Sequence, residues 1–200
     1  MPKLYVIGGA NGCGKTTWYN TAVQRKFIDP QLSFINVDLI TLQELGGYSE
    51  ENFARADLIA RQRIKMHIDN HENFMIESNL SKSSDYDWLQ SMSKNGYELI
   101  LYFLGTDDID INYGRVKKRV KEGGHDVPEN IILHRYQMSQ AYLKSKIFLF
   151  SEAYFIDNSE SFSKIMAVFK IGKITQKEEN CSNWVNDILS LIIRLQAKNL

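Results

Sequence analysis

The most regular feature of the sequence is an alternation of short apolar runs with longer amphipathic stretches. Five apolar runs, rich in branched and aromatic residues, predict buried strands at 4–9, 32–38, 73–78, 98–105 and 153–158. Between them, apolar residues spaced among charges predict helices over 16–27, 49–69, 84–94 and 107–121. Strands that alternate with helices form a mostly parallel sheet covered on both faces. We therefore expect a three-layer α/β/α fold with a mostly parallel five-stranded sheet.

The region from about residue 160 onward has a different pattern. Segment 164–176 predicts one or two further strands, and 183–196 predicts an amphipathic helix. The wide apolar face of that helix consists of Trp184, Val185, Ile188, Leu189, Ile192 and Ile193. Packing on the sheet explains this face, and binding of a partner protein is the alternative. Because no repeat or linker divides the chain, we expect a single domain over 1–200 with a C-terminal extension over about 160–200.

Composition and charge narrow the classes of partner. Of 200 residues, 44% are hydrophobic, and 24 basic residues balance 24 acidic ones. A net charge of zero gives no field that would attract nucleic acid or an anionic membrane. The two cysteines, Cys13 and Cys181, are too few for a disulfide framework or a zinc cluster. Because the N-terminal apolar run is also too short for a secretion signal, we expect a soluble, cytoplasmic protein.

The most informative motif joins the first predicted strand to the first predicted helix. It matches G-x-x-x-x-G-K-[ST] at every fixed position, in the strand–loop–helix context of a nucleoside-triphosphate phosphate loop (P-loop). Glycines let the backbone turn its N–H groups toward phosphate. Lys15 would reach the β- and γ-phosphates, the Thr16 hydroxyl would bind Mg²⁺, and Cys13 would contribute its amide. The residues expected around the phosphates are Gly9, Ala10, Asn11, Gly12, Cys13, Gly14, Lys15, Thr16 and Thr17.

Acidic residues follow the predicted strands. Asp38 ends "FINVD", Glu77 lies beside Ser78 at the end of "FMIES", and Asp157 precedes Asn158. Ligands of open α/β sheets bind beyond the carboxyl ends of the strands. In a phosphoryl-transfer site, a carboxylate there either accepts the proton of the attacking hydroxyl or holds Mg²⁺. Facing water or capping a helix is the other reading, and the residues alone do not divide base from metal ligand.

A basic segment at 114–136 resembles a helical lid. Arg115 and Arg119 are four residues apart and therefore share a helix face. The helix should stop at Gly123–Gly124, and Arg135 lies in the helix that follows. Fixed guanidinium groups can stabilise the charge that spreads over a transferred phosphoryl group. His125, in the intervening loop, either contacts the substrate or is a loop residue without a catalytic role; Lys117, Lys118 and Lys121 suit a solvated face.

These pieces occur in the order found in zeta-toxin-like P-loop kinases. The resemblance covers roughly 3–160 and includes the P-loop, "FINVD", "RAD" at 55–57, "FMIESNLS", "NGYELILYFLG", "RVKKRVKEGGHDVPENIILHRY" and "FIDNS". The run Gly-Gly-His-Asp-Val-Pro followed by Arg-Tyr is the most specific piece. The chain looks most like the short, single-domain branch, sometimes labelled predicted ABC-type ATPases.

The resemblance implies the fold of nucleotide and shikimate kinases, with ATP and Mg²⁺ as cofactors. Characterised toxins of the family phosphorylate the 3′-hydroxyl of UDP-N-acetylglucosamine, and an antitoxin protein blocks their nucleotide site. By position, Asp38 matches the general base, Glu77 the glutamate near the sugar nucleotide, and Arg119 and Arg135 the lid arginines. The acceptor side would also include Asn79, Arg115 and His125.

The chain departs from the toxins at His125 and Asp126 in the lid, and at "ESN" after the third predicted strand. These departures bear on the acceptor and leave the ATP site unchanged. The leading hypothesis is a kinase acting on a small-molecule hydroxyl. The alternatives are a nucleotide-binding regulatory module, which would contact a partner through the helix at 183–196, and an ATPase acting on nucleic acid or in transport.

Overall fold

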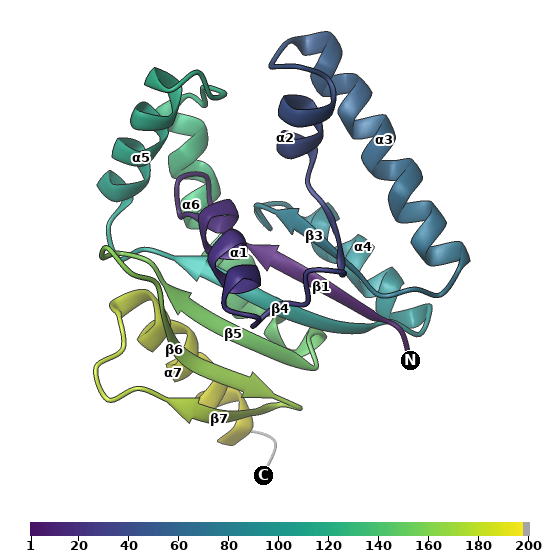
Figure 1. The fold of residues 1–200 in the computed structure, drawn as a ribbon. Helices are drawn as coiled ribbons and strands as arrows, with labels where there is room; N and C mark the ends of the chain where they lie inside the picture. The colour runs from purple at the N-terminus through teal and green to yellow at the C-terminus, as the bar shows by residue number, and fades with distance from the viewer. Residues whose placement is uncertain (198–200) are drawn as a thin grey trace.

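The computed structural model describes residues 1–197, which form one seven-stranded sheet with strand order β2-β3-β1-β4-β5-β6-β7 (Figure 1). The strands are β1 Lys3–Gly8, β2 Ser33–Ile35, β3 Phe74–Ser78, β4 Glu98–Gly105, β5 Glu152–Asp157, β6 Lys164–Lys170 and β7 Lys173–Lys177. The first five are parallel, and β6 and β7 run antiparallel. The expected α/β fold is confirmed.

The prediction of five strands was wrong, because the C-terminal segment 164–176 continues the same sheet. β6 pairs with β5 from Glu152 opposite Lys170 to Asp157 opposite Lys164. An antiparallel strand needs no crossover helix, so the short connection after β5 is enough to bring β6 alongside it. The local apolar pattern predicted one or two strands over 164–176 without showing which existing strand they would join.

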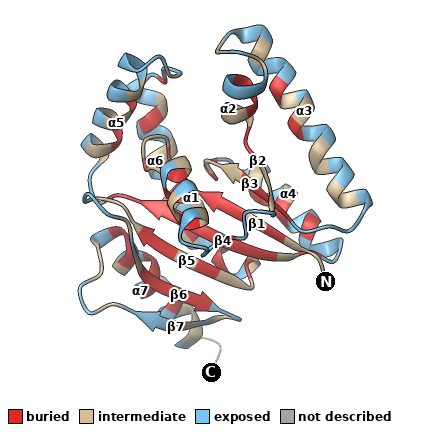
Figure 2. Cartoon of the chain, viewed as in Figure 1, coloured by how far each residue is buried: buried red, intermediate tan, exposed pale blue. Residues whose placement is uncertain are grey.

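Helices cover both faces of the sheet, because the side chains on both faces of its central strands are buried. They are α1 Lys15–Gln24, α2 Val37–Leu39, α3 Glu50–Asp69, α4 Ser83–Lys94, α5 Ile109–Lys121, α6 Glu129–Lys146 and α7 Asn183–Ala197, with a π-helical turn at Ile40–Glu44 and a 3₁₀ turn at Ile147–Leu149. In β4, Leu99, Leu101 and Phe103 face one core, and Ile100, Tyr102 and Leu104 face the other. The central strand β4 is accordingly buried along most of its length, whereas the edge strand β7 is mostly exposed (Figure 2).

The two cores are unequal. The larger contains apolar side chains of α3, α4, α6 and α7, while the smaller is closed mainly by Trp18 and Ala22 of α1. Figure 1 shows α1 alone on the near face of the sheet. The arrangement leaves the start of α1 at the carboxyl ends of the parallel strands, where ligands of open α/β sheets bind.

The C-terminal helix packs on the sheet, as the first of its two interpretations predicted. Trp184, Val185, Ile188, Leu189 and Ile192 are buried. Ile193 is 54% exposed, so the apolar contact face is narrower than the sequence pattern indicated. A Cβ atom added to Gly105 would lie 2.6 Å from the Trp184 ring. A side chain at Gly105 would therefore displace α7 from the end of β4.

Asp38 does not end a strand, contrary to the prediction. β2 stops at Ile35, and Asn36 begins a new helix by accepting a hydrogen bond from the Leu39 amide at 3.1 Å. Asparagine is a strong helix N-cap because its side chain satisfies an otherwise free amide. Asp38 thus lies in the first turn of α2. None of the helices within residues 1–197 is long and apolar enough to cross a membrane.

Candidate active site

The P-loop connects β1 to α1 and has the backbone that its glycines predict. Gly12 and Gly14 have φ angles of 79° and 94°, in the left-handed region that favours glycine. A Cβ atom on Gly12 would lie 2.4 Å from the Asn112 carbonyl oxygen, and one on Gly14 would lie 2.2 Å from Asn158 Nδ2. Both positions therefore favour glycine for conformation, and Gly12 also requires it for space, because its neighbour is backbone.

The start of α1 is open to an anionic ligand. Gly14 is the N-cap, and as a glycine it has no side chain that could cap the helix. The first turn of α1 contains no acidic residue. Helix N-termini leave several amide N–H groups without an intrahelical partner and carry the positive end of the helix dipole. This end of α1 therefore fits a phosphate group.

Lys15 is folded back over the loop. Its Nζ donates to the carbonyl oxygens of Gly9 at 2.7 Å and Ala10 at 3.2 Å, and to Asn79 Oδ1 at 3.2 Å. It also lies 3.7 Å from Glu77 Oε1, and its side chain is only 6% exposed. These contacts keep the ammonium group beneath the space that the loop encloses, and they place Asn79 beside the P-loop.

Glu77, on β3, joins the P-loop to the start of α2. Its Oε2 accepts hydrogen bonds from the Thr16 hydroxyl at 3.1 Å and from Asn36 Nδ2 at 2.7 Å. Burial raises the pKa of the Glu77 carboxyl above its ordinary value, while the adjacent Lys15 charge opposes the rise. One carboxylate therefore fixes the orientation of both the Thr16 hydroxyl and the cap of the helix that carries Asp38.

The P-loop borders a cleft of about 450 Å³, which we call the P-loop cleft. One wall contains Lys15 and Thr16 with Asp38 and Glu77 nearby, and the opposite wall belongs to α5. The full lining is Asn11, Gly12, Gly14, Lys15, Thr16, Thr17, Asp38, Glu77, Arg115, Val116, Lys118, Arg119, Glu122, Asn158, Glu160 and Ser161. Charged side chains thus lie on both walls of the cleft, and the space between them is large enough for a triphosphate.

Arg115 and Arg119 supply the positive charge of the α5 wall. Arg115 Nη2 donates to the Glu160 carbonyl oxygen at 3.4 Å, and Arg119 Nη2 donates to the His125 carbonyl oxygen at 2.8 Å. Arg115 Nη1 and Arg119 Nε are buried and have no hydrogen-bond partner among the residues that the structure describes. Buried polar groups are nearly always paired, so these two nitrogens are suited to an anionic ligand.

Arg135 approaches the site from α6 but does not line the P-loop cleft. Its Nη1 donates to the side-chain oxygen of Asn11 at 2.7 Å. Partial burial lowers the pKa of the Arg135 guanidinium, and the Asp38 charge, which is close enough to act on it, opposes that change. Arg135 therefore contacts the P-loop through Asn11, whereas Arg115 and Arg119 face the cleft directly.

His125 lies outside the lining of the P-loop cleft as well. Its ring stacks on the rings of Tyr48 and Phe53. Tyr48 precedes α3, and Phe53 lies at the start of that helix. The side chain of Cys13, within the P-loop, is buried in the smaller core, and burial raises the pKa of its thiol. A protonated, buried thiol is a poor nucleophile, which agrees with a role for Cys13 through its backbone.

Three asparagines support the site and were not identified as support residues from the motifs. Asn36 bonds Glu77, as described above, and Asn158 Nδ2 donates to the Cys13 carbonyl oxygen at 2.8 Å. Asn112, completely buried on α5, donates to the Asn11 carbonyl oxygen at 2.6 Å and accepts from the Thr106 hydroxyl at 2.5 Å. A polar residue at an otherwise buried helix position was the available signal for Asn112.

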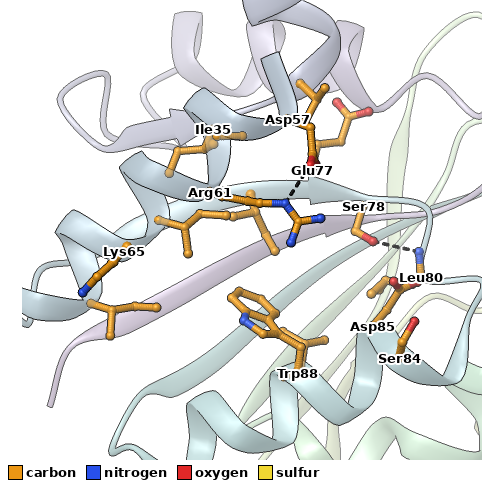
Figure 3. Close-up of a pocket in the computed structure, with 16 residues that line it drawn as sticks. Ile35, Asp57, Arg61, Lys65, Glu77, Ser78, Leu80, Ser84, Asp85 and Trp88 are labelled. Atoms are coloured by element: carbon orange, nitrogen blue, oxygen red, sulfur yellow. Dashed lines mark hydrogen bonds and ion pairs between the residues drawn. The ribbon is translucent and has the colours of Figure 1, made fainter. Parts of the chain in front are cut away.

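A second cavity, of about 470 Å³, lies between α3 and α4 and adjoins Glu77; we call it the α3–α4 cavity. Figure 3 shows the Arg61 guanidinium and the Trp88 ring entering it from opposite helices, with Asp57 bonded to Arg61. Its floor and walls are largely apolar, formed by Ile35, Val37, Ala60, Ile64, Ile68, Ile76, Leu80 and Leu89. Glu77 is a lining residue of both the cavity and the cleft, so the two spaces lie on either side of it.

Known proteins resemble this chain in sequence or in structure. An uncharacterised protein of Haemophilus influenzae is 32% identical over 139 residues, covering 67% of this chain and 92% of the relative. A chain of the PezAT chromosomal toxin–antitoxin system of Streptococcus pneumoniae has a TM-score of 0.56 at 16% identity, covering 99% of this chain and 87% of that one. A chain of the AvrRxo1-ORF1:-ORF2 complex solved with ATP has a TM-score of 0.66 at 13% identity.

The AvrRxo1 match covers 96% of this chain and 64% of that one, so this chain spans less than two thirds of the AvrRxo1 chain. At such low identities, the structural likenesses establish a shared fold. The sequence establishes more, because the family model described as "Zeta toxin" matches residues 1–159. The P-loop, Glu77 and the lid arginines all lie within that match, and the chain belongs to the zeta toxin family, with the fold of its P-loop kinases.

Proposed function

We propose that the protein is an ATP-dependent phosphotransferase that moves the γ-phosphoryl group to a hydroxyl of a small molecule. The observation that carries this proposal is the composition of the P-loop cleft. Lys15 and Thr16 lie on one wall, near Asp38 and Glu77, and two buried guanidinium nitrogens without a partner in residues 1–197 belong to Arg115 and Arg119 on the other. An enzyme that transfers a phosphoryl group needs both a phosphate cradle and fixed charge around the moving group.

The residues present fit ATP and Mg²⁺. The uncapped start of α1 and the glycine conformations suit the phosphates, and Lys15 can exchange its carbonyl contacts for phosphate oxygens. The Thr16 hydroxyl, backed by the Glu77 carboxylate, would hold the ion. Mg²⁺ in such sites is bound by few protein groups, with phosphates and water completing the shell. When bound, the ion neutralises charge on the phosphates.

Asp38 is the residue we assign as general base. Glu77 already accepts two hydrogen bonds and lies against Lys15, so its carboxylate is occupied in holding the site together. Asp38 lines the cleft from the first turn of α2. The acceptor hydroxyl gives its proton to Asp38 as its oxygen bonds to the γ-phosphorus, and the bond from that phosphorus to the bridging oxygen breaks, releasing ADP.

Arg115 and Arg119 would act on the transferred group, and Arg135 would hold its side of the P-loop. Charge spreads over three oxygens of the phosphoryl group during transfer, and planar guanidinium groups match that geometry. Arg115 and Arg119 line the cleft, and their buried nitrogens Nη1 and Nε have no partner among residues 1–197, so bonding to a phosphoryl oxygen would displace no hydrogen bond of the described chain. Arg135, bonded to Asn11, keeps positive charge near the phosphates.

The α3–α4 cavity is our candidate for the body of the acceptor, and UDP-N-acetylglucosamine is the first acceptor to test. Glu77 lines both the cavity and the cleft that contains Asp38, so an acceptor in the cavity would lie next to the cleft and would present a hydroxyl past Glu77 toward Asp38. Trp88 offers an aromatic face, and Arg61 and Lys65 also line the cavity, each in an ion pair, with Asp57 and Asp69 respectively, that an anionic acceptor would have to compete with. Family membership supports this choice, because the resemblance to characterised zeta toxins implies that sugar nucleotide as the acceptor.

The test is phosphorus NMR of the purified protein with ATP, Mg²⁺ and a panel of UDP-sugars. We expect a new phosphomonoester resonance on one sugar nucleotide. Lys15→Ala should reduce its formation by at least about a hundredfold, since it removes the main cation beneath the phosphates. Lys94→Ala, an exposed lysine at the end of α4, is the matched control and should have wild-type activity. Release of free phosphate alone would contradict the sugar-nucleotide acceptor, and absence of any ATP turnover would contradict the kinase.

The PezAT neighbour, which belongs to a toxin–antitoxin system, supports a second proposal about partners. We propose that an antitoxin protein binds this chain over the P-loop cleft. A nucleotide-binding module that acts through such a partner is the alternative function. Affinity capture with wild type and with Arg115→Glu tests the surface, since a charge reversal at the cleft wall should weaken the complex. Capture that is unaffected by both this change and added ATP would contradict binding over the cleft.

A further inference from the structure

The loop between α5 and α6 crosses from the lid to the opposite side of the cleft. Figure 1 shows this loop extending from the end of α5 toward α2 and α3. The His125 ring lies 5.4 Å from the Tyr48 ring, with 29° between their planes, and 6.3 Å from the Phe53 ring, with 18° between planes. Tyr48 precedes α3 and Phe53 lies in its first turns. We call Tyr48, Phe53 and His125 the aromatic clasp.

The end of α5 directs His125 across the cleft. The Gly124 amide donates to the Arg119 carbonyl oxygen at 2.9 Å, and the Gly123 amide donates to the Val120 carbonyl oxygen at 3.0 Å. This pair of bonds, with Gly123 at φ 86°, is a Schellman ending, which reverses the chain after a helix. A Cβ atom on Gly124 would lie 2.5 Å from Arg119 Cγ. Both glycines are therefore needed for the direction in which the loop leaves the helix.

The clasp also contacts the charged part of the site. The His125 carbonyl oxygen accepts the 2.8 Å hydrogen bond from Arg119 Nη2. On the other side, burial raises the pKa of the Tyr48 phenol, and the Asp38 charge adds to that rise while Arg119 opposes it. His125 thus contacts Tyr48 and Phe53 through its ring and the lid residue Arg119 through its backbone carbonyl oxygen.

We propose that the aromatic clasp holds the lid against the α2–α3 side of the cleft, and that His125 is a positioning residue that places Arg119 for phosphoryl transfer. The inference rests on the proposed kinase function. His125 is an exposed residue and Phe53 is 45% exposed, so the stack can open without disturbing the core. When the His125 ring leaves Tyr48 and Phe53, the acceptor can enter the cleft. When the ring stacks on them again, the backbone of His125 holds Arg119 beside the transferred group.

The experiment compares His125→Phe, His125→Gln and His125→Ala in the full chain. The phenylalanine variant keeps a stacking ring, and the glutamine variant keeps polarity without one. We expect kcat for ATP turnover to fall about tenfold in the Ala and Gln variants and to stay within about twofold of wild type in the Phe variant, because two aromatic contacts are lost or kept. ATP affinity should be unchanged in all three variants, since none alters the P-loop. Equal losses in the Phe and Gln variants would overturn the role of stacking.

NMR of the histidine rings tests the clasp independently of activity. The chain has four histidines, so the His125 resonances can be assigned from the His125→Phe spectrum. Stacking on Tyr48 and Phe53 should move them upfield, and Phe53→Leu should reverse part of that shift. Leu58→Ala, an exposed apolar residue on the same helix, is the matched control and should leave the spectrum unchanged. Unshifted wild-type resonances would overturn the clasp even if the protein is an active kinase; shifted resonances without ATP turnover would retain the contact but overturn its role in transfer, together with the proposed function.

Discussion

The two walls of the P-loop cleft are built in different ways. The P-loop wall stands on β1, in which Leu4, Val6 and Ile7 are completely buried between both cores. The lid wall consists of α5 and the loop after it, and its own apolar cluster is small, with Val116 and Val127 among its buried members. One wall is therefore fixed by burial, and the other depends on a few apolar contacts and on polar contacts with its surroundings.

Asn11 provides the polar connection between the walls. Its side-chain oxygen accepts from Arg135 Nη1, and its carbonyl oxygen accepts from Asn112 Nδ2. Both lid helices thus contact the same residue of the P-loop. Under the proposed function, this difference predicts that binding and transfer are separable: the buried wall should hold phosphate by itself, whereas transfer should need the weaker wall in its correct position.

Removal of the assigned base should have the largest effect. We expect Asp38→Asn to lower phosphotransfer by about 10²- to 10⁴-fold, because a positioned general base contributes that much. ATP affinity should be retained, since Asp38 lies on α2 and not in the P-loop. Single-turnover assays beside nucleotide-binding titrations separate the two quantities. Full phosphotransfer by the variant would remove Asp38 from the mechanism.

The lid wall is tested by Arg119→Lys, which keeps the charge and loses the planar fork. We expect a loss of about 10- to 100-fold in kcat, because lysine cannot donate to His125 and to a phosphoryl oxygen in the same arrangement. Arg55→Lys, on the exposed face of α3, is the matched control and should match wild type in steady-state assays. A loss confined to ATP affinity would place Arg119 in nucleotide binding, and the separation of the walls would then fail.

Glu77 gives the P-loop wall a pH dependence. Its pKa is raised in the folded protein, so the unfolded chain ionises first as pH rises, and the folded state is favoured less. The stability that a protonated Glu77 contributes is present below the ordinary glutamate pKa and is lost as pH rises toward the raised value. We expect Glu77→Gln to remove this part of the decline in the free energy of unfolding, measured by urea titration between about pH 4 and pH 7. An identical pH profile in wild type and variant would contradict the direction of the shift.

The smallest effect is expected from Trp184→Phe, which tests how the P-loop wall is supported from behind. Trp184 Nε1 donates to Asp157 Oδ1 at 2.8 Å, and the next residue, Asn158, bonds the P-loop at Cys13. We expect the free energy of unfolding to fall by about 1 kcal/mol from the lost hydrogen bond. Turnover should change less than about twofold. Trp88→Phe is the control in thermal melts, and a large loss of kcat in Trp184→Phe alone would show that α7 takes part in positioning the loop.

The same difference between the walls explains what the sequence could predict. The strands and the P-loop follow from local patterns, since apolar runs and glycine spacing are properties of adjacent residues. The move of Asp38 from a strand end into α2 depends on Asn36, a single capping residue within an apolar run. The stacking of Phe53 on His125 joins segments far apart in the chain, and no periodicity encodes which loop meets which helix. Lid arginines could be named from the sequence, but their partners could not.

Strands β6 and β7 follow the residues that the family model matches, and they affect how the sheet could associate with other molecules. An unpaired strand at the edge of a sheet is a template for pairing with another molecule. β6 covers β5 along its length, and the new edge, β7, is a short strand with lysines at Lys173 and Lys177 and mostly exposed side chains. A chain ending at residue 159 would present β5 as an open edge beside the uncovered Phe155 and Ala153. The C-terminal strands therefore act as protection against aggregation at the edge of the sheet farthest from β2.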